Sequence, residues 1–130
     1  MTKHIYCDVV IAGCGVAGLY TALNLPEDLH GVGICKEDMG TCDSMLAQGG
    51  ICVLRGEDDY EPYFEDTMRA GHYENRKESV DLMIRTSPGI IRHLLELGVG
   101  FDKNPDGSLQ YTKQGAHSRP RICFHEDITG

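Results

Sequence analysis

The 130-residue chain carries a formal net charge of −8, with 41% hydrophobic and 25% charged residues, which is the composition of an ordinary globular domain. This acidic balance argues against nucleic acid or an anionic membrane as a partner, because both require a basic surface. No apolar stretch approaches the length that spans a bilayer. The first residues run directly into a predicted strand and leave no room for a signal peptide, so we expect a cytoplasmic protein.

The six cysteines show no C-x-x-C pair, whereas a disulfide framework or a zinc site requires tighter, paired spacing. Cys123 and His125, with His117 nearby, lack a fourth ligand and the spacing of a metal site. We therefore expect reduced thiols and no bound metal.

A strand, a glycine-rich turn, a helix and a second strand open the chain. The β-branched run of residues 7–12 predicts a parallel strand buried on both faces, residues 17–25 a helix that Pro26 ends, and residues 31–35 the second strand. Residues 37–50 show no apolar periodicity, and a loop of this length in a compact domain is usually functional.

Short elements follow the loop. We expect a strand at residues 51–54 and a helix from the cap Asp59 to about residue 70. A second helix should begin at Asn75, with Glu78 completing a capping box, and a third at Ser87 with a proline in its first turn. The turn at residues 104–107 predicts a hairpin between residues 99–101 and 109–112.

Residues 13–18 fit the dinucleotide fingerprint G-x-G-x-x-G in the required context, after a strand and into a helix. Gly13 permits the tight turn, Gly15 lets a pyrophosphate approach the backbone, and Gly18 lets the helix pack on the strand. The acidic residue that usually ends the second strand and holds a ribose is absent, and Cys35 and Lys36 stand there instead. Either Glu37 binds the ribose hydroxyl from its place two residues after Cys35, or another donor holds the ribose. The ammonium of Lys36 lies near the adenosine half of the cofactor or is merely solvated.

A second glycine cluster lies in residues 43–50. Gly49 and Gly50 allow backbone N–H groups to approach a planar ligand. Gln48 offers a donor and an acceptor suited to an isoalloxazine edge, and Ser44 a hydroxyl for phosphate or ribityl oxygens. A plain glycine turn is the alternative. Because a nicotinamide protein has no need of this second element, the two clusters together predict FAD rather than NAD(P).

The run Met-Leu-Ala-Gln-Gly-Gly-Ile at residues 45–51 resembles the flavin loop of the succinate dehydrogenase/fumarate reductase flavoprotein superfamily. Within it, the chain is similar to the L-aspartate oxidase family, with further matches at residues 65–67, 70–71, 98–102, 115–122 and 125–130. The resemblance implies an α/β fold: a Rossmann-like βαβ FAD-binding fold with a parallel sheet, incomplete, plus additional helices and a small β-hairpin. Residues 1–130 would be the N-terminal part of an FAD-binding domain, truncated before the capping and C-terminal domains.

With the fingerprint glycines, the resemblance places the expected FAD contacts on Gly13, Cys14, Gly15, Val16, Ala17, Gly18, Lys36, Asp43, Ser44, Met45, Leu46, Ala47, Gln48, Gly49 and Gly50. In the membrane-bound relatives a histidine linked covalently to the flavin stands at the position of Asp43. A carboxylate cannot form that bond, so we expect non-covalent FAD.

Gln114 stands where the L-aspartate oxidase family usually carries a glutamate that meets the α-ammonium of the substrate. Gln114 accepts a hydrogen bond but lacks the charge, which leaves open the preference for aspartate over dicarboxylates without an ammonium. The implied reaction oxidises L-aspartate to iminoaspartate for quinolinate and NAD synthesis, with O2 or fumarate reoxidising the flavin and quinolinate synthase as the partner suggested by the family.

No catalytic residue is expected in this chain, since the family's catalytic arginine and most dicarboxylate-binding residues lie beyond Gly130. Two rival functions are a soluble fumarate reductase-like flavoprotein, which the uncharged Gln114 favours, and a folded but non-catalytic fragment.

Overall fold

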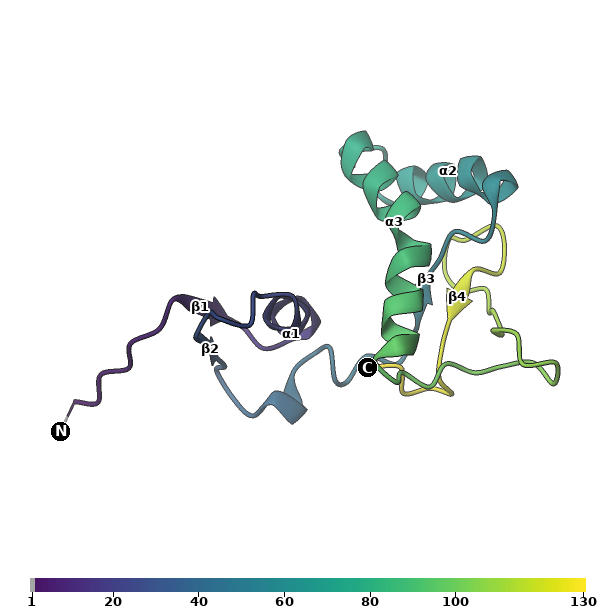
Figure 1. Cartoon of the computed structure of the whole chain (residues 1–130). Coiled ribbons are helices and arrows are strands. Elements are labelled where there is room, and N and C mark those ends of the chain that lie inside the picture. Colours follow the sequence, from purple (N-terminus) through teal and green to yellow (C-terminus); the bar gives the residue numbers. More distant parts are fainter. Residues whose placement is uncertain (1) are drawn as a thin grey trace. The chain divides into compact units, whose positions relative to one another are not determined.

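The computed structural model describes residues 2–130 and divides into two compact units. The N-terminal unit runs to Ala47 and also includes Gly130, and the C-terminal unit comprises Gln48–Thr129. The predicted α/β class, with a parallel sheet and additional helices, is confirmed (Figure 1).

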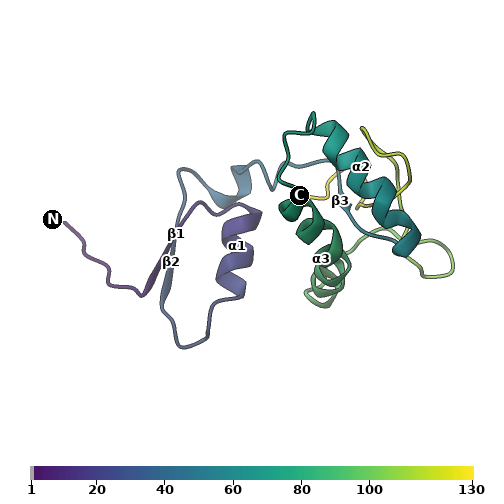
Figure 2. The same ribbon diagram turned by 90° about the horizontal axis from the view of Figure 1, so that it is seen from above.

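The N-terminal unit is a βαβ unit, as predicted. Strand β1 (Val9–Ala12) leads into helix α1 (Val16–Leu23), and strand β2 (Gly31–Ile34) pairs with β1 in parallel, so that Ala12 lies opposite Ile34. The N–H of Gly13 extends the pairing by donating to the carbonyl of Ile34 at 2.8 Å. Both views show α1 beside the two strands, and a short 3-10 helix, η1 (Met39–Thr41), follows β2 (Figures 1 and 2).

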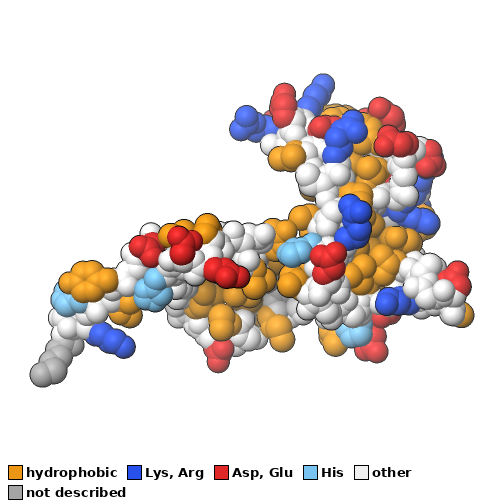
Figure 3. All heavy atoms as spheres, viewed as in Figure 1, with side chains coloured by type: hydrophobic (Ala, Val, Ile, Leu, Met, Phe, Trp, Pro, Cys, Tyr) orange, Lys and Arg blue, Asp and Glu red, His pale blue; other side chains and the backbone are white. Residues whose placement is uncertain are grey.

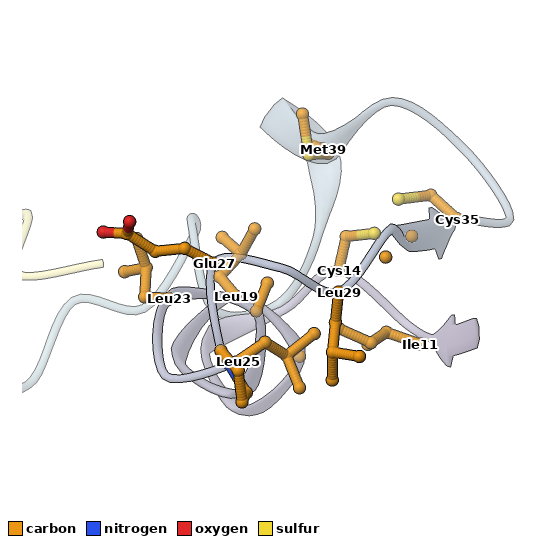
Figure 4. Close-up of a pocket in the computed structure, with 14 residues that line it drawn as sticks. Ile11, Cys14, Leu19, Leu23, Leu25, Glu27, Leu29, Cys35 and Met39 are labelled. Carbon is orange, nitrogen blue, oxygen red and sulfur yellow. The ribbon is translucent and has the colours of Figure 1, made fainter. Parts of the chain in front are cut away.

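The expectation that β1 is buried on both faces is wrong for the described chain. Val10 is 58% exposed, and no residue of α1 is buried. One helix on two strands covers too little surface, so apolar side chains of α1 and β1 line an open cavity of about 720 Å³ instead (Figure 4). The space-filling view shows such apolar side chains at the surface of this unit (Figure 3).

The C-terminal unit consists of a small antiparallel sheet and two helices. Strand β3 (Ile51–Cys52) is followed by η2 (Glu57–Asp59), α2 (Tyr60–Ala70), α3 (Lys77–Glu96) and strand β4 (Ile122–Cys123). Strand β3 pairs with β4, Ile51 opposite Cys123, so the predicted strand at residues 51–54 is shorter than expected. Two groups of buried apolar side chains form the core: Val53, Ile91, Phe101 and Cys123, and Tyr63, Met68, Val80 and Ile84.

The two helices predicted between residues 75 and 98 are one continuous helix, α3, with Pro88 in its interior. Pro88 has no N–H to give the carbonyl of Ile84, and the hydroxyl of Ser87 donates to that carbonyl at 2.6 Å instead. The same hydroxyl accepts the N–H of Leu54 at 2.9 Å. The capping box at Asn75 is also wrong, because the helix begins after Arg76 with no side-chain cap.

The predicted hairpin forms, but its paired segment is shorter than expected: the N–H of Asn104 donates to the carbonyl of Ser108 at 2.8 Å, and the N–H of Gln110 donates to that of Asp102 at 2.9 Å. Gly107 donates its N–H to the carbonyl of Asn104 at 2.9 Å, and Lys103 and Leu109 make an isolated antiparallel bridge. The pairing does not extend to residues 99–101 or to Thr112, because Val99 donates its N–H to the C-terminus of α3 and Thr112 pairs with Ile122.

All six cysteines are free thiols, as predicted. Within residues 2–130 no helix is long and apolar enough to cross a membrane.

Candidate functional site

The glycine turn between β1 and α1 has the geometry that its sequence requires. Gly13 has φ +105°, a conformation that favours glycine, and a Cβ on Gly18 would lie 1.9 Å from the carbonyl oxygen of Gly13. The packing role predicted for Gly18 is therefore confirmed. A Cβ on Gly15 would meet the hydroxyl of Ser44 at 2.9 Å, so the backbone is bare on the side that faces Ser44.

The N-terminus of α1 presents hydrogen-bond donors. The N–H of Val16 donates to Oγ of Ser44 at 3.0 Å, which brings the second predicted segment onto the glycine turn. Among the described residues, the N–H groups of Gly15, Ala17 and Gly18 have no acceptor, and the first turn carries no acidic side chain. Free N–H groups and the helix dipole together favour an anion at this position.

A cavity of about 410 Å³ lies beside this turn, at the carboxyl ends of β1 and β2. Lys36 and Asp43 both line it, together with Gly13, Gly15 and Glu37. The sequence left Lys36 as either a ligand contact or a solvated side chain, and its place in this wall favours the contact. A glycine cradle, unpaired N–H groups and a nearby ammonium form a donor set that fits a dinucleotide pyrophosphate and its adenosine end.

The remaining residues of the predicted flavin loop divide between the two units. Met45 and Leu46 are exposed, and Ala47 accepts the N–H of Gly130 at 2.8 Å, all within the N-terminal unit. Gln48, Gly49 and Gly50 belong to the C-terminal unit, where Gln48 is exposed.

A second cavity, of about 770 Å³, lies within the C-terminal unit. Gly49, Gly50 and Gln114 all line it, and Oε1 of Gln114 lies 3.5 Å from the position of a Cβ on Gly49. The structure thus brings Gln114 to the end of the predicted flavin loop. A Cβ on Gly50 would lie 2.3 Å from the carbonyl oxygen of Cys123, so the glycine at position 50 is required by packing against β4.

A buried group of charges anchors the segment that carries Gln114. Arg121 is completely buried and bridges two carboxylates, at 2.8 Å to Asp59 and 2.8 Å to Asp66. Asp66 also accepts the N–H and the hydroxyl of Ser118, each at 2.6 Å. Helix α2 and the η2 turn before it therefore hold the chain at Ser118 and Arg121, four and seven residues beyond Gln114.

These contacts change the protonation of Asp66 and the role of Asp59. Burial alone would raise the pKa of Asp66, but the hydrogen bonds from Ser118 and Arg121 outweigh it and hold the pKa well below its ordinary value. Asp59, predicted as a helix cap, makes no cap hydrogen bond, because its carboxylate binds Arg121 instead.

His117 is enclosed by the same group. Its Nδ1 accepts a hydrogen bond from Nη1 of Arg121 at 3.0 Å, and its Nε2 lies 3.1 Å from Sγ of Cys52. Burial and the charge of Arg121 lower the pKa of His117, so its ring is neutral with the proton on Nε2. Burial raises the pKa of Cys52, which therefore remains a thiol and is no nucleophile. In residues 2–130 no cluster of three or more His, Cys, Asp or Glu side chains could hold a metal ion.

The sequence reasoning missed this charge group, although a signal was present. Asp59, Tyr63 and Asp66 are spaced i, i+4, i+7, which places two carboxylates on the inward face of a helix. Acidic residues on an apolar face require a buried cation as partner, and Arg121 is that cation.

Fold, glycine turn and cavity together define a dinucleotide-binding flavoprotein domain, and the family model described as "FAD binding domain" matches residues 8–129. The chain belongs to this family, and its cofactor is FAD.

More particularly, the chain is similar to L-aspartate oxidases. It is 49% identical over 123 residues to the enzyme of Clostridium perfringens and 46% identical over 127 residues to that of Clostridium acetobutylicum. These alignments cover 95% and 98% of this chain but only 28% and 29% of the two relatives. The quinol fumarate reductase flavoprotein of Escherichia coli superposes with a TM-score of 0.86 at 26% identity, covering 95% of this chain and 22% of that one. The predicted superfamily is confirmed.

Proposed function

We propose that this chain is the N-terminal part of the FAD-binding domain of an L-aspartate oxidase, and that the full-length protein oxidises L-aspartate to iminoaspartate. The observation that carries the proposal is the place of Gln114, whose Oε1 lies against Gly49 in one cavity. The identity to L-aspartate oxidases of two clostridia supports the choice of substrate.

FAD would be held by the glycine turn and the segment that follows β2. The unpaired N–H groups of Gly15, Ala17 and Gly18 would bind the pyrophosphate, and Lys36 would approach the adenosine end. Ser44, Met45, Leu46, Ala47, Gln48, Gly49 and Gly50 would continue along the flavin half. When bound, FAD supplies the two-electron acceptor for the substrate hydride. Asp43 lines the cavity but cannot form the histidyl–flavin bond, so binding would be non-covalent.

Gln114 would accept a hydrogen bond from the α-ammonium of the substrate through Oε1. The contacts of Asp66 with Ser118 and Arg121 fix the backbone just beyond it, so the side chain is presented by an anchored segment rather than a free loop. The neutral ring of His117 adds no positive charge that would repel the ammonium. These residues bind and orient the substrate and leave the proton chemistry to residues outside this chain.

The test is the kinetics of the full-length protein with Gln114→Glu, because a charged acceptor strengthens only the contact with the ammonium. A hydrogen bond to a charged group is worth about 1.5–3 kcal/mol against about 1 for a neutral one, so kcat/KM for aspartate should rise roughly tenfold relative to that for fumarate. Gln110→Glu is the matched control, since Gln110 is exposed and lines neither of the two cavities. Equal changes for both substrates, or none, would remove Gln114 from the site.

A soluble fumarate reductase-like activity is the second candidate, and the uncharged side chain of Gln114 favours it. The two functions differ in the direction of electron transfer between the dicarboxylate and the flavin. Flavin reduction by aspartate faster than reoxidation of reduced flavin by fumarate supports the oxidase, and the reverse order supports the reductase.

We extend the proposal to the partners and the location. A small dicarboxylate would be the substrate, with O2 or fumarate as electron acceptor and quinolinate synthase as the enzyme that receives the unstable imine. The acidic charge balance supports the absence of a nucleic-acid partner, and we propose a cytoplasmic location.

A further inference from the structure

Two thiols meet beside the glycine turn. Cys14, inside the fingerprint, and Cys35, just after β2, line the same 410 Å³ cavity. Sγ of Cys14 lies 3.0 Å from the position of a Cβ on Gly33, so this sulfur packs closely over strand β2. In Figure 4 the two sulfur atoms point toward one another.

The strand register brings the two residues to the same end of the sheet. Ala12 pairs with Ile34, and Gly13 donates its N–H to the carbonyl of Ile34, so Cys35 follows the last pair directly and Cys14 lies one residue further along its own segment. Neighbouring strands are about 4.8 Å apart, and a disulfide requires Cα atoms about 4.4–6.8 Å apart. Because Cys14 and Cys35 are not register partners, closing the bond requires adjustment of the glycine turn that carries Cys14.

We propose that Cys14 and Cys35 form an oxidisable thiol pair, which hydrogen peroxide closes to a disulfide when FAD is absent and which bound FAD protects. The protection rests on the FAD site proposed above. Cys14 occupies a variable position of the pyrophosphate turn, and Cys35 stands where the ribose-binding acid usually does, so the pair lies under the adenosine half of the cofactor.

The chemistry balances in two steps. The thiolate of Cys14 attacks the peroxide, an S–O bond forms as the O–O bond breaks, and hydroxide leaves. The sulfur of Cys35 then attacks Cys14, an S–S bond forms as the S–O bond breaks, and water leaves once the proton of Cys35 is transferred to the departing oxygen. Two thiols lose two electrons and one peroxide becomes two waters.

Cys14 is the first attacker because its neighbour keeps its proton. The neighbouring thiol of Cys14, and then burial, raise the pKa of Cys35. The thiolate is the stronger nucleophile, so Cys14 attacks the peroxide first, and Cys35 attacks the sulfenic acid afterwards, as its proton passes to the departing oxygen. The closed disulfide draws the sulfurs to about 2.05 Å and ties the fingerprint to β2, which opposes the loading of FAD.

The test treats the full-length protein, freed of FAD or saturated with it, with hydrogen peroxide. Trypsin leaves all of Cys7, Cys14 and Cys35 on one peptide, because no lysine or arginine lies between residues 3 and 36. A second cleavage after Glu27 separates Cys14 from Cys35, so only a disulfide keeps the two fragments joined until they are reduced. We expect joined fragments in the FAD-free protein and at least tenfold slower joining with FAD bound.

Variants assign the bond. Cys14→Ser and Cys35→Ser should each abolish the joined fragments, and either one suffices if the other does not fold. Cys7→Ser and Cys42→Ser should retain them, although Cys7 shares a fragment with Cys14 and Cys42 lines the same cavity. Fragments that never join in FAD-free protein overturn the proposal.

FAD binding is measured on the reduced, FAD-free protein, before peroxide is added, by quenching of flavin fluorescence. Reduced protein that binds FAD yet oxidises at an unchanged rate overturns the protection. Reduced protein that binds no FAD, but joins Cys14 to Cys35 when peroxide is added, supports the thiol pair and overturns the proposed FAD site, so the two failures are distinguishable.

Discussion

Replacing Arg121 with methionine removes a buried guanidinium and leaves its partners behind. The lost hydrogen bonds are two to Asp59, at 2.8 and 3.2 Å, one to Asp66 at 2.8 Å and one to His117 at 3.0 Å. Asp66 keeps its bonds to Ser118, but the side chain of Asp59 is only 4% exposed and is left without its buried cation. Breaking a buried ion pair in this way costs about 3–5 kcal/mol of unfolding free energy.

Arg119 offers a matched control two residues away. Its guanidinium is 46% exposed and pairs with the exposed Asp58 at 3.0 Å and, at 4.0 Å, with Asp59, so Arg119→Met should cost only about 0–1 kcal/mol. Urea unfolding followed by helical circular dichroism measures both variants, since α2 and α3 lie in the same unit as these pairs.

A compensating variant covers the case in which Arg121→Met does not fold. Adding Asp59→Asn removes the stranded carboxylate, so the double variant should recover part of the lost stability. The reasoning from buried charge would be refuted if Arg121→Met lost free energy of unfolding within 1 kcal/mol of the loss for Arg119→Met and if adding Asp59→Asn recovered none of it.

Gly50→Ala should strongly destabilise the chain, because the added Cβ would lie 2.3 Å from the carbonyl oxygen of Cys123. Gly89→Ala, which adds a Cβ into open space on a helix, should instead stabilise the chain by about 0.5–1 kcal/mol. The urea midpoints of the two variants measure both effects. Asp66 has a lowered pKa in the folded state, so the stability that its carboxylate gives is present above the ordinary pKa of 3.8 and is lost as the pH falls below that value. In Asp66→Asn, the urea midpoint should therefore depend less on pH between pH 4 and 2 than in the unchanged protein. Acid precipitation of full-length protein should leave all flavin in the supernatant, and yellow pellets would contradict the role given to Asp43. The 130-residue chain alone should show no aspartate-dependent flavin reduction. Among the described residues, no lysine or arginine lines the Gln114 cavity to bind the substrate carboxylates. Turnover of aspartate by the purified chain, shown to contain no enzyme of the expression host, would disprove this prediction.

The features that could be predicted from the sequence are mostly those determined by residues close together in the chain. The βαβ unit and the glycine turn follow from an apolar run and three glycines whose conformational needs are met within a few residues. The contact of Ser44 with the first turn of α1 spans 28 residues, and only the resemblance to a flavin loop placed the two segments together.

Long-range pairing was the part that the sequence did not reveal. Strand β4 is two residues long and has no alternation to show, so its pairing with β3 had no local signature. The hairpin is shorter than predicted for a similar reason, since Thr112 pairs with the distant Ile122 rather than across the turn. Asp59 has the residue type of a helix cap, and only the folded position of Arg121 decides otherwise.

The interior proline of α3 has a consequence for how this segment can change during evolution. Pro88 removes a donor, and Ser87 supplies one to the same carbonyl of Ile84 while also receiving the N–H of Leu54. Losing the serine alone leaves that carbonyl and the N–H of Leu54 unpaired, whereas losing the proline alone gives one carbonyl two competing donors. The two neighbours are thus coupled in sequence, and the interruption in the helix is also the point that attaches it to the chain after β3.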